Sequence, residues 1–304
     1  MRVVFMGTPD FAVPSLRLLA EKHEVVLTLT RPDAVRGRGR KLVASPVKQA
    51  AQELGIDVIE TTKITDEVFD ALKQAAPDVI AVVAYGCLLP QRVLELAPHG
   101  CINVHGSLLP KWRGAAPIQR AVFEGDERVG ISIMRLVMAM DAGPYCRQAS
   151  VELGDKDCAT VMTELSEIGA HELLAAFEQL EDGTVTWTEQ DEEQVTFAEK
   201  IEKAEMLLDP ACDALANVRR VRAATDAAPA RLMVAGKGMR AKAAHVASGV
   251  LGSGEVQVRK GHVVLGCADG CLELDVVKPD GKREMPASAW ASGLRGDSIC
   301  WERA

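Results

Sequence analysis

Short apolar runs recur along the first half of the chain, separated by stretches with the period of an amphipathic helix. The runs at residues 2–6, 24–30, 78–84 and 101–105 have the length of strands, and the run at 78–84 is almost entirely apolar, as in strands that a parallel sheet buries on both faces. A long helical pattern follows at residues 158–179. Strands that alternate with helices predict right-handed βαβ units. We therefore expect an α/β fold with a doubly wound, Rossmann-like parallel sheet.

The pattern changes after residue 180. Residues 181–205 are rich in Asp and Glu and poor in apolar side chains, which is typical of a linker or an exposed crossover. Beyond them, short strand-like segments between residues 230 and 277 are divided by Gly and Asp-Gly signals, as in a small closed barrel. We predict a Rossmann-like domain over residues 1–184, a linker over 185–204, and a smaller C-terminal barrel domain over 205–304.

The composition is that of a globular protein with a substantial core. The chain has 304 residues, of which 48% are hydrophobic and 26% charged. Its longest apolar runs fall far short of a membrane span, and residues 1–7 lead directly into a strand and a turn instead of a signal-peptide core. We therefore expect a cytoplasmic protein without a membrane segment.

The cysteines give no sign of a metal site. The eight cysteines form no CxxC pair, and only Cys267 and Cys271 lie close together in the sequence. No group of His or Cys residues with metal-ligand spacing accompanies them. We expect reduced thiols that pack as small apolar side chains, and no bound metal.

The charge is acidic overall but uneven. The formal net charge of -8 argues against a protein that coats nucleic acid, although 14 basic residues stand against 12 acidic ones from Glu205 onward. Residues 31–41 are a local basic run within the acidic first part. Such runs are commonly solvated loops, yet a basic loop with glycines at the ligand end of a sheet also suits recognition of phosphates or a nucleic-acid end. Its basic residues are Arg31, Arg36, Arg38, Arg40 and Lys41.

A polar pair interrupts the apolar run at residues 101–105. Asn103 and His105 are two positions apart, so on an extended backbone they project from the same face, at the end where open α/β sheets bind ligands. By themselves they suit a structural role, such as tying down a turn, as well as a catalytic one. Asp141, which follows another apolar run and precedes Ala-Gly, adds a carboxylate. These three residues are the candidate centre of the chemistry.

A dinucleotide-binding site is disfavoured. The first predicted strand is followed by Gly7-Thr-Pro-Asp-Phe11, which lacks the GxGxxG glycines that let a pyrophosphate approach the backbone. A nicotinamide-dependent dehydrogenase is therefore a distant alternative.

The stretch Asn103-Val-His-Gly-Ser-Leu-Leu-Pro110, with Trp112-Arg-Gly114 and Asp141, resembles the formyltransferases that use 10-formyltetrahydrofolate. The similarity extends over nearly all of residues 1–200, including the turn after the first strand and Ala84-Tyr-Gly86. The resemblance is closest to the members that formylate the methionine of initiator Met-tRNA. It implies that activity, with 10-formyltetrahydrofolate as formyl donor, no metal, and a C-terminal OB-type barrel that lies along the tRNA. We expect the protein to be a monomer.

The resemblance also implies roles for individual residues. Asn103, His105 and Asp141 are similar to the catalytic residues of the family. The folate site would be lined by Ser107, Leu108, Leu109, Pro110, Tyr85 and Val137, and the tRNA would be held by Arg36, Arg38, Arg40 and Lys41.

The catalytic roles agree with the chemistry of formyl transfer. The reaction passes through a tetrahedral carbon whose oxygen gains negative charge, which the Asn103 amide can stabilise. A neutral His105 can take the proton of the attacking amine, or serve mainly as an oxyanion partner. Asp141 can orient His105 and, through water, help protonate the departing nitrogen.

The sequence is also compatible with two other functions. The first is formylation of a small amine, such as an amino sugar nucleotide or glycinamide ribonucleotide, which would leave the basic run at 31–41 without an evident purpose. The second is an RNA-binding or regulatory protein on a former enzyme scaffold, which would have no need of Asn103, His105 and Asp141.

Overall fold

The computed structural model describes all residues except 37–40, 260 and 295–298. By their contacts, the described residues fall into two compact units. The first comprises Met1–Ile118, Arg128–Glu152 and Val161–Ala198, and the second comprises Gln119–Glu127, Leu153–Thr160 and Glu199–Ala304. This grouping differs from the predicted ranges in two ways. Residues up to Ala198 group with the first unit, and residues 119–127 and 153–160 group with the second. No helix among the described residues is long and apolar enough to cross a membrane.

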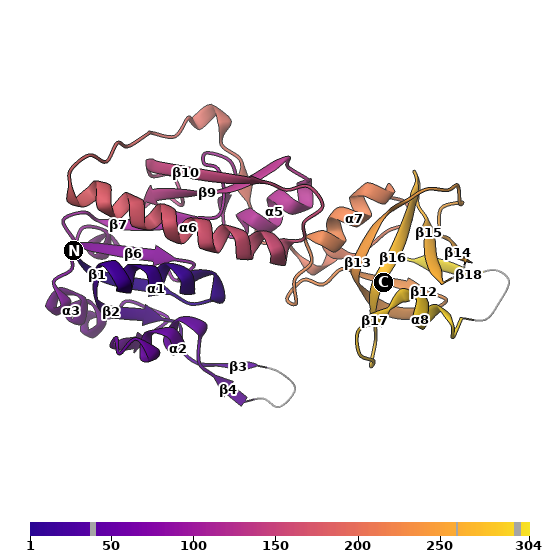
Figure 1. Ribbon diagram of the computed structural model, residues 1–304, viewed down its shortest axis with the longest axis horizontal. Coiled ribbons are helices and arrows are strands. Elements are labelled where there is room, and N and C mark those ends of the chain that lie inside the picture. The colour runs from indigo at the N-terminus through magenta and orange to yellow at the C-terminus, as the bar shows by residue number, and fades with distance from the viewer. Residues whose placement is uncertain (37–40, 260, 295–298) are drawn as a thin grey trace. The chain divides into compact units, whose positions relative to one another are not determined.

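The described part of the first unit is built on a seven-stranded sheet with the order β10-β9-β7-β6-β1-β2-β5 (Figure 1). The five strands from β7 to β5 are parallel, whereas β9 and β10 are antiparallel to their neighbours. The predicted doubly wound, mainly parallel sheet is confirmed. The strands are β1 (Arg2–Gly7), β2 (Glu24–Thr30), β5 (Val58–Glu60), β6 (Val79–Val83), β7 (Cys101–His105), β9 (Arg128–Arg135) and β10 (Tyr145–Glu152).

Two helices of this part begin at a residue whose hydroxyl caps the helix. The hydroxyl of Ser45 accepts the backbone N–H of Lys48, and that of Thr65 accepts the N–H of Val68. Pro46 occupies the first position of its helix, where no N–H is needed. Along residues 1–181 the described helices are η1 (Asp10–Ala12), α1 (Val13–Lys22), α2 (Pro46–Glu53), α3 (Asp66–Ala75), α4 (Gln91–Leu94), α5 (Pro117–Glu124) and α6 (Cys158–Glu181). Most of α5 and the first residues of α6 group with the second unit.

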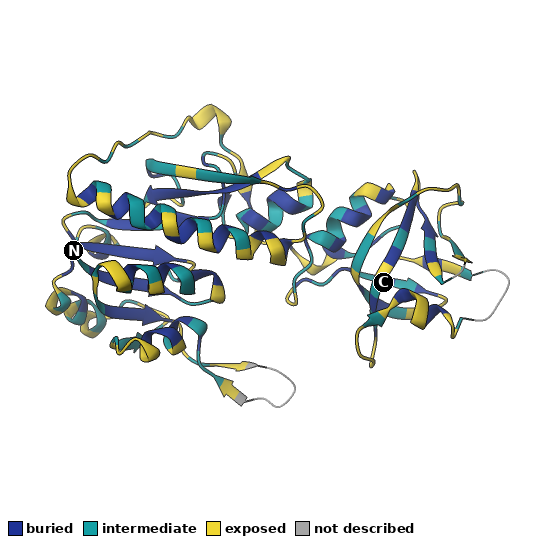
Figure 2. Ribbon diagram, viewed as in Figure 1, coloured by how far each residue is buried: buried dark blue, intermediate teal, exposed yellow. Residues whose placement is uncertain are grey.

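The central strands are buried on both faces (Figure 2). On one face, Met6 and Ile80 pack in a cluster with Leu72 of α3. On the other, α6 lies close against β7, because a Cβ at Gly169 would come within 2.9 Å of Val104. Side chains alternate along a strand, so Val104 faces α6 and its neighbours face the opposite way. This packing directs the candidate catalytic side chains of β7 away from the helix.

Two short ladders lie outside the main sheet. β3 (Ala34–Arg36) pairs antiparallel with β4 (Lys41–Val43), so the basic run at 31–41, which we expected to be a loop, has strands within it. β8 (Arg113–Gly114) pairs parallel with β11 (Phe197–Ala198), and η2 (Glu192–Gln194) precedes β11.

The described strands of the second unit form a closed antiparallel barrel. They follow the order β13-β12-β18-β14-β15-β16-β17, and an additional pairing of β13 with β16 closes the ring. The predicted barrel is confirmed. Its strands are β12 (Arg231–Val234), β13 (Lys237–Ala247), β14 (Glu255–Arg259), β15 (His262–Gly266), β16 (Cys271–Pro279), β17 (Met285–Pro286) and β18 (Ile299–Glu302), and its helical elements are η3 (Lys203–Met206), α7 (Ala214–Arg222) and α8 (Ala287–Ala291).

The barrel has its own apolar core. Leu232, Leu265 and Leu274 are buried in it together with Val218 of α7. The indole of Trp301 is also buried there, and its Nε1–H donates to the carbonyl of Gly266 at 2.8 Å. This hydrogen bond satisfies the polar end of a large aromatic side chain inside the core.

Candidate active site

Asn103 and His105 lie at the carboxyl end of β7, where they pair with Met134 and Ser132 of β9. The side chain of His105 is only 5% exposed. Asn103 is half-buried, and its carboxamide makes no hydrogen bond with any residue in the described part of the chain. An amide that is already positioned but unpaired is available to donate to a substrate oxygen.

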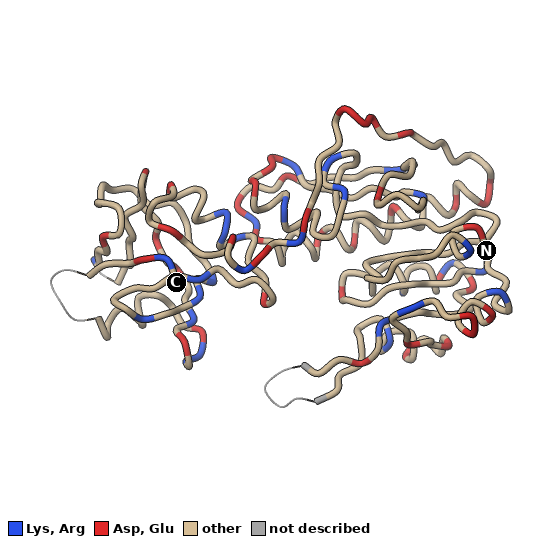
Figure 3. The backbone as a smooth tube through the Cα atoms, turned by 180° about the vertical axis from the view of Figure 1, so that it is seen from behind, with Lys and Arg blue, Asp and Glu red and all other residues tan. Residues whose placement is uncertain are grey.

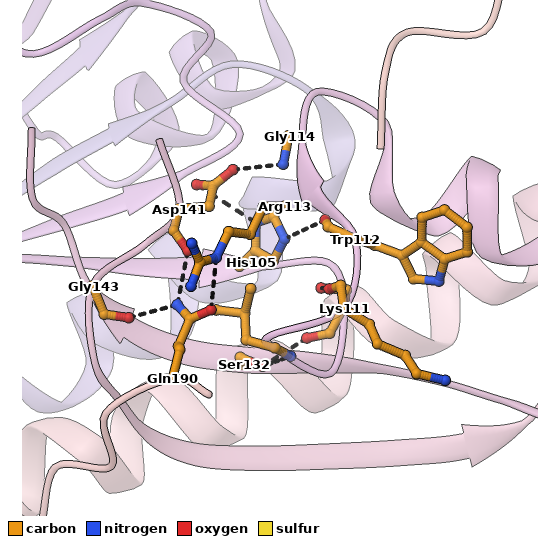
Figure 4. Close-up of polar contacts among 11 residues, drawn as sticks. His105, Lys111, Trp112, Arg113, Gly114, Ser132, Asp141, Gly143 and Gln190 are labelled. Atoms are coloured by element: carbon orange, nitrogen blue, oxygen red, sulfur yellow. Dashed lines mark hydrogen bonds and ion pairs between the residues drawn. The ribbon is translucent and has the colours of Figure 1, made fainter. Parts of the chain in front are cut away.

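The hydrogen bonds of His105 indicate where its proton lies (Figure 4). Its Nε2 is 3.0 Å from the carbonyl oxygen of Trp112. Because a carbonyl only accepts, Nε2 carries the hydrogen and donates it. Its Nδ1 lies 3.8 Å from Oδ1 of Asp141. Burial lowers the pKa of His105, although the Asp141 carboxylate acts in the opposite direction. The imidazole is therefore neutral near pH 7, with a lone pair on Nδ1.

Asp141 is held beside His105 by the turn that follows Trp112. Its Oδ2 accepts the backbone N–H of Gly114 at 2.9 Å, and its side chain is 16% exposed. Gly114 has a φ of 127°, and a Cβ there would lie 2.8 Å from the carbonyl oxygen of Ala198. The close approach of β11 therefore requires glycine at this position. The carboxylate is fixed by the backbone and keeps Oδ1 facing the imidazole.

Gln190 supports the loop that carries Asp141. Its Nε2 donates to the carbonyl oxygens of Asp141 and Gly143 at 2.8 and 2.7 Å. Its Oε1 accepts the Nε–H of Arg113 at 2.9 Å. The buried Arg113 also pairs with Glu192 at 2.8 Å. Both Gln190 and Glu192 fall in the predicted linker, and no sequence signal marked their role because they lie in a polar, acidic stretch.

Thr196 anchors the same segment. Its Oγ1 accepts the N–H of Trp112 at 2.9 Å, and its carbonyl oxygen accepts the N–H of Arg113. Trp112 has a φ of 63°, a conformation that non-glycine residues rarely adopt. The contacts of Thr196 hold the strained turn whose carbonyl orients His105.

Ser132 fixes the expected folate wall. Its hydroxyl donates to the carbonyl of Ser107 at 2.6 Å and accepts the N–H of Leu109 at 3.0 Å. Gln148 donates to the carbonyl of Leu109 and to the Ser132 hydroxyl, both at 2.9 Å. The side chains of Ser107 and Leu109 are buried, while Leu108 and Pro110 are partly exposed. Only part of the predicted wall therefore presents side chains to a ligand.

The other expected folate residues differ in exposure. Tyr85 lies in the apolar core, and burial raises the pKa of its phenol. Any contact of Tyr85 with a ligand would have to use its backbone. Val137 is 40% exposed, and its neighbours Met138 and Met140 are 63% and 66% exposed. This loop presents the apolar surface that a flat pterin ring requires.

The expected tRNA-binding residues are only partly covered by the structure. The backbone of Arg36 ends β3 and that of Lys41 begins β4. Arg38 and Arg40 lie outside the described residues, as do the side chains of Arg36 and Lys41.

Two family models match the sequence. One, described as formyl transferase, matches residues 1–176. The other, described as formyl transferase, C-terminal domain, matches residues 200–295.

Similar proteins cover nearly the whole chain. A methionyl-tRNA formyltransferase from Bifidobacterium animalis subsp. lactis is 44% identical over 96% of this chain and 97% of its own length. Another from a Nocardioides species is 40% identical over 97% of this chain and 96% of its own length. The crystal structure of HypX from Aquifex aeolicus in complex with tetrahydrofolic acid has a TM-score of 0.66 at 19% identity, over 98% of this chain and 48% of that one. The structural likeness shows the fold alone.

Proposed function

This chain belongs to the formyl transferase family, and we propose that it transfers the formyl group of 10-formyltetrahydrofolate to the α-amino group of methionine on initiator Met-tRNA, producing formylmethionyl-tRNA for translation initiation. Near-full-length relatives that carry the name methionyl-tRNA formyltransferase support this substrate. The observation that carries the chemistry is the buried His105 at the end of β7, whose Nε2 lies 3.0 Å from the carbonyl of Trp112 and whose Nδ1 lies 3.8 Å from Asp141.

In the proposed reaction, the amine nitrogen of methionine attacks the formyl carbon, and a new C–N bond forms. The formyl oxygen gains negative charge and accepts a hydrogen bond from the Asn103 carboxamide, which has no other partner among the described residues. The amine loses a proton to Nδ1 of His105, and the adjacent Asp141 carboxylate stabilises the resulting imidazolium.

The second step breaks the bond between the carbon and the N10 of the folate. N10 takes up a proton as it leaves, delivered from the imidazolium through water held by Asp141. The products are formylmethionyl-tRNA and tetrahydrofolate, and His105 returns to its neutral state. No step requires a metal.

For the folate, we propose that the pterin lies against Leu108 and Pro110 and against the exposed side chain of Val137. Ser107, Leu109 and Tyr85 support this surface from within, since their side chains are buried. Ser132 holds the wall in place through both of its backbone contacts.

For the tRNA, we propose that Arg36, Arg38, Arg40 and Lys41 contact the acceptor end, where a polyanion needs local positive charge in a protein of net charge -8. We further propose that the enzyme acts as a monomer in the cytoplasm, where charged tRNA is used.

The test is formyl transfer from 10-formyltetrahydrofolate to charged initiator Met-tRNA, with free methionine and glycinamide ribonucleotide as competing acceptors. We expect turnover on the charged tRNA alone. Asn103→Ala and His105→Gln should each lower kcat/KM by roughly 10²- to 10⁴-fold, because each removes a group that acts in the transition state.

The matched control is His171→Gln, the same change at an exposed position on α6, and it should retain full activity. Turnover on glycinamide ribonucleotide without RNA would exclude the proposed substrate. Full activity of His105→Gln would exclude the proposed base.

A further inference from the structure

The outer face of the barrel carries a group of side chains that formyl transfer does not use. His245 of β13 is opposite Glu273 of β16, and Asp275 lies two positions further along β16. Residues two apart on a strand share a face, so both carboxylates lie on the side of β16 that His245 occupies. His245 is about 30 positions away from the two carboxylates in the sequence, and the pairing of β13 with β16 brings it next to them (Figure 1).

The contacts within this group are short. Nδ1 of His245 lies 3.0 Å from Oδ2 of Asp275, and Nε2 lies 3.7 Å from Oε2 of Glu273. His262 of β15 approaches the other oxygen of Glu273 at 2.5 Å through its own Nδ1. Glu273 thus lies between two imidazoles, and its side chain is only 16% exposed.

The two carboxylates of the group have histidines as their charged partners. Within the part of the chain that the structure describes, neither Glu273 nor Asp275 pairs with a lysine or an arginine. Imidazole is itself a metal ligand, so a cation can join this group without displacing a lysine or an arginine.

We propose that His245, Glu273 and Asp275 bind a divalent transition metal ion such as Zn²⁺. One ligand atom from each of these residues lies within 4.8 Å of the others, against about 3.3 Å along the edge of a tetrahedral zinc site. The side chains of His245 and Asp275 are 50% and 41% exposed, so both can rotate toward a shared ion.

The donor set selects the class of metal. An imidazole with two carboxylates suits Zn²⁺, Co²⁺ or Ni²⁺ better than Mg²⁺ or Ca²⁺, which prefer oxygen ligands alone. Three protein ligands leave a fourth position for water. His262 is a positioning residue, because its ring holds the oxygen of Glu273 that faces away from His245. The metal would join β13 to β16 on the outside of the barrel.

The experiment is a calorimetric titration of the tag-free full-length chain with zinc chloride, beside magnesium chloride. We expect saturable binding of one Zn²⁺ per chain that Mg²⁺ does not compete away. His245→Gln and Asp275→Asn should each weaken it by at least about tenfold, and His262→Gln should weaken it by roughly 10- to 100-fold. His171→Gln, an exposed histidine on α6, should leave it unchanged.

Cobalt replacement tests the ligands directly. Co²⁺ should give visible d–d absorption without a thiolate charge-transfer band, and His262→Gln should shift this spectrum, which a merely structural role would not do. Zn²⁺ should also raise the unfolding temperature of the wild-type chain but not of Asp275→Asn. Absence of saturable binding, equal affinity in His245→Gln, or a thiolate band would each overturn the proposal. None of these measurements depends on formyl transfer, so their outcome is independent of whether the proposed reaction is correct.

Discussion

A single carbonyl group decides which nitrogen of His105 is free to act as a base. Trp112 offers its backbone oxygen to Nε2, so the hydrogen stays on that side and the lone pair of Nδ1 faces Asp141. A histidine that is buried but neutral is suited to accept a proton at pH 7. The backbone turn at Trp112 is therefore part of the proposed catalytic arrangement, although its side chain takes no proton.

The protonation of His105 can be measured directly. We expect its pKa, followed by NMR of the ring protons, to lie below 6.5, because burial disfavours the imidazolium. Asp141→Asn should lower this pKa further, since the carboxylate is the group that favours the charge. His105→Gln assigns the signal, and the exposed His171 serves as the reference. A rise of the pKa in Asp141→Asn would contradict this account.

The same shift has a consequence for stability. The pKa of His105 is lower in the folded chain than in the unfolded one, so the unfolded state binds the proton first as the pH falls. The contribution of His105 to stability is therefore complete above about pH 6.5 and is lost below it.

Ser132 provides a second prediction. Ser132→Ala should lower the free energy of unfolding by about 1–3 kcal/mol, because it leaves the buried N–H of Leu109 without its acceptor. The KM for 10-formyltetrahydrofolate should rise as the wall loosens. The matched control is Ser15→Ala, since the hydroxyl of Ser15 is also buried but has no partner, and this change should leave stability unchanged or higher. Equal losses in the two variants would argue against the bridging role of Ser132.

Among the elements, the segment from Gln190 to β11 is the one whose role differs most from expectation. Its acidic composition predicts a linker, yet its residues bond to the loop of Asp141 and to the turn at Arg113. Asp141 is thus held from both sides, because Gly114 bonds its carboxylate and Gln190 bonds its backbone carbonyl. Residues that follow the long helix α6 complete the site that β7 begins.

Gln190→Ala should lower kcat by roughly 10- to 100-fold, because the loop of Asp141 loses two hydrogen bonds and the carboxylate shifts relative to His105. The KM for the folate should change less. Steady-state kinetics give both constants. Gln194→Ala, an exposed glutamine of the same segment, is the control and should behave as wild type. If Gln194→Ala lost as much activity, the effect would belong to the whole segment and not to Gln190.

At the scale of the whole molecule, the net negative charge limits how the protein can bind a polyanion. Basic and acidic residues are interspersed along both units, and the net charge is -8 (Figure 3). An acidic protein that acts on a polyanion depends on a few local basic residues, and screening by salt weakens exactly those contacts. Binding of the tRNA should therefore respond to salt more than binding of the folate.

We expect Arg38→Ala to raise the KM for charged tRNA and to reduce the slope of log KM against log salt by about one. The KM for 10-formyltetrahydrofolate should stay the same. Arg17→Ala, which removes an exposed arginine on α1, is the control. An equal effect of Arg38→Ala on both substrates would show that the basic run does not contact the tRNA.

Local patterns in the sequence were sufficient for much of the fold and pointed to the candidate site residues. The apolar run of β6 predicted a strand buried on both faces, and the strand-like segments after residue 230 predicted the barrel. Asn103 and His105 could be found because a polar pair on an otherwise buried strand is unusual. Each of these signals is local and depends on the period of a helix or a strand.

Only the tertiary structure decided what surrounds those residues. The tautomer of His105 follows from the carbonyl of Trp112, and the support of Asp141 by Gln190 joins positions 49 residues apart. The group of His245 with Glu273 likewise exists because β13 closes on β16. A hydrogen bond depends on distance and direction in space, and a sequence that records only the order of residues does not specify either.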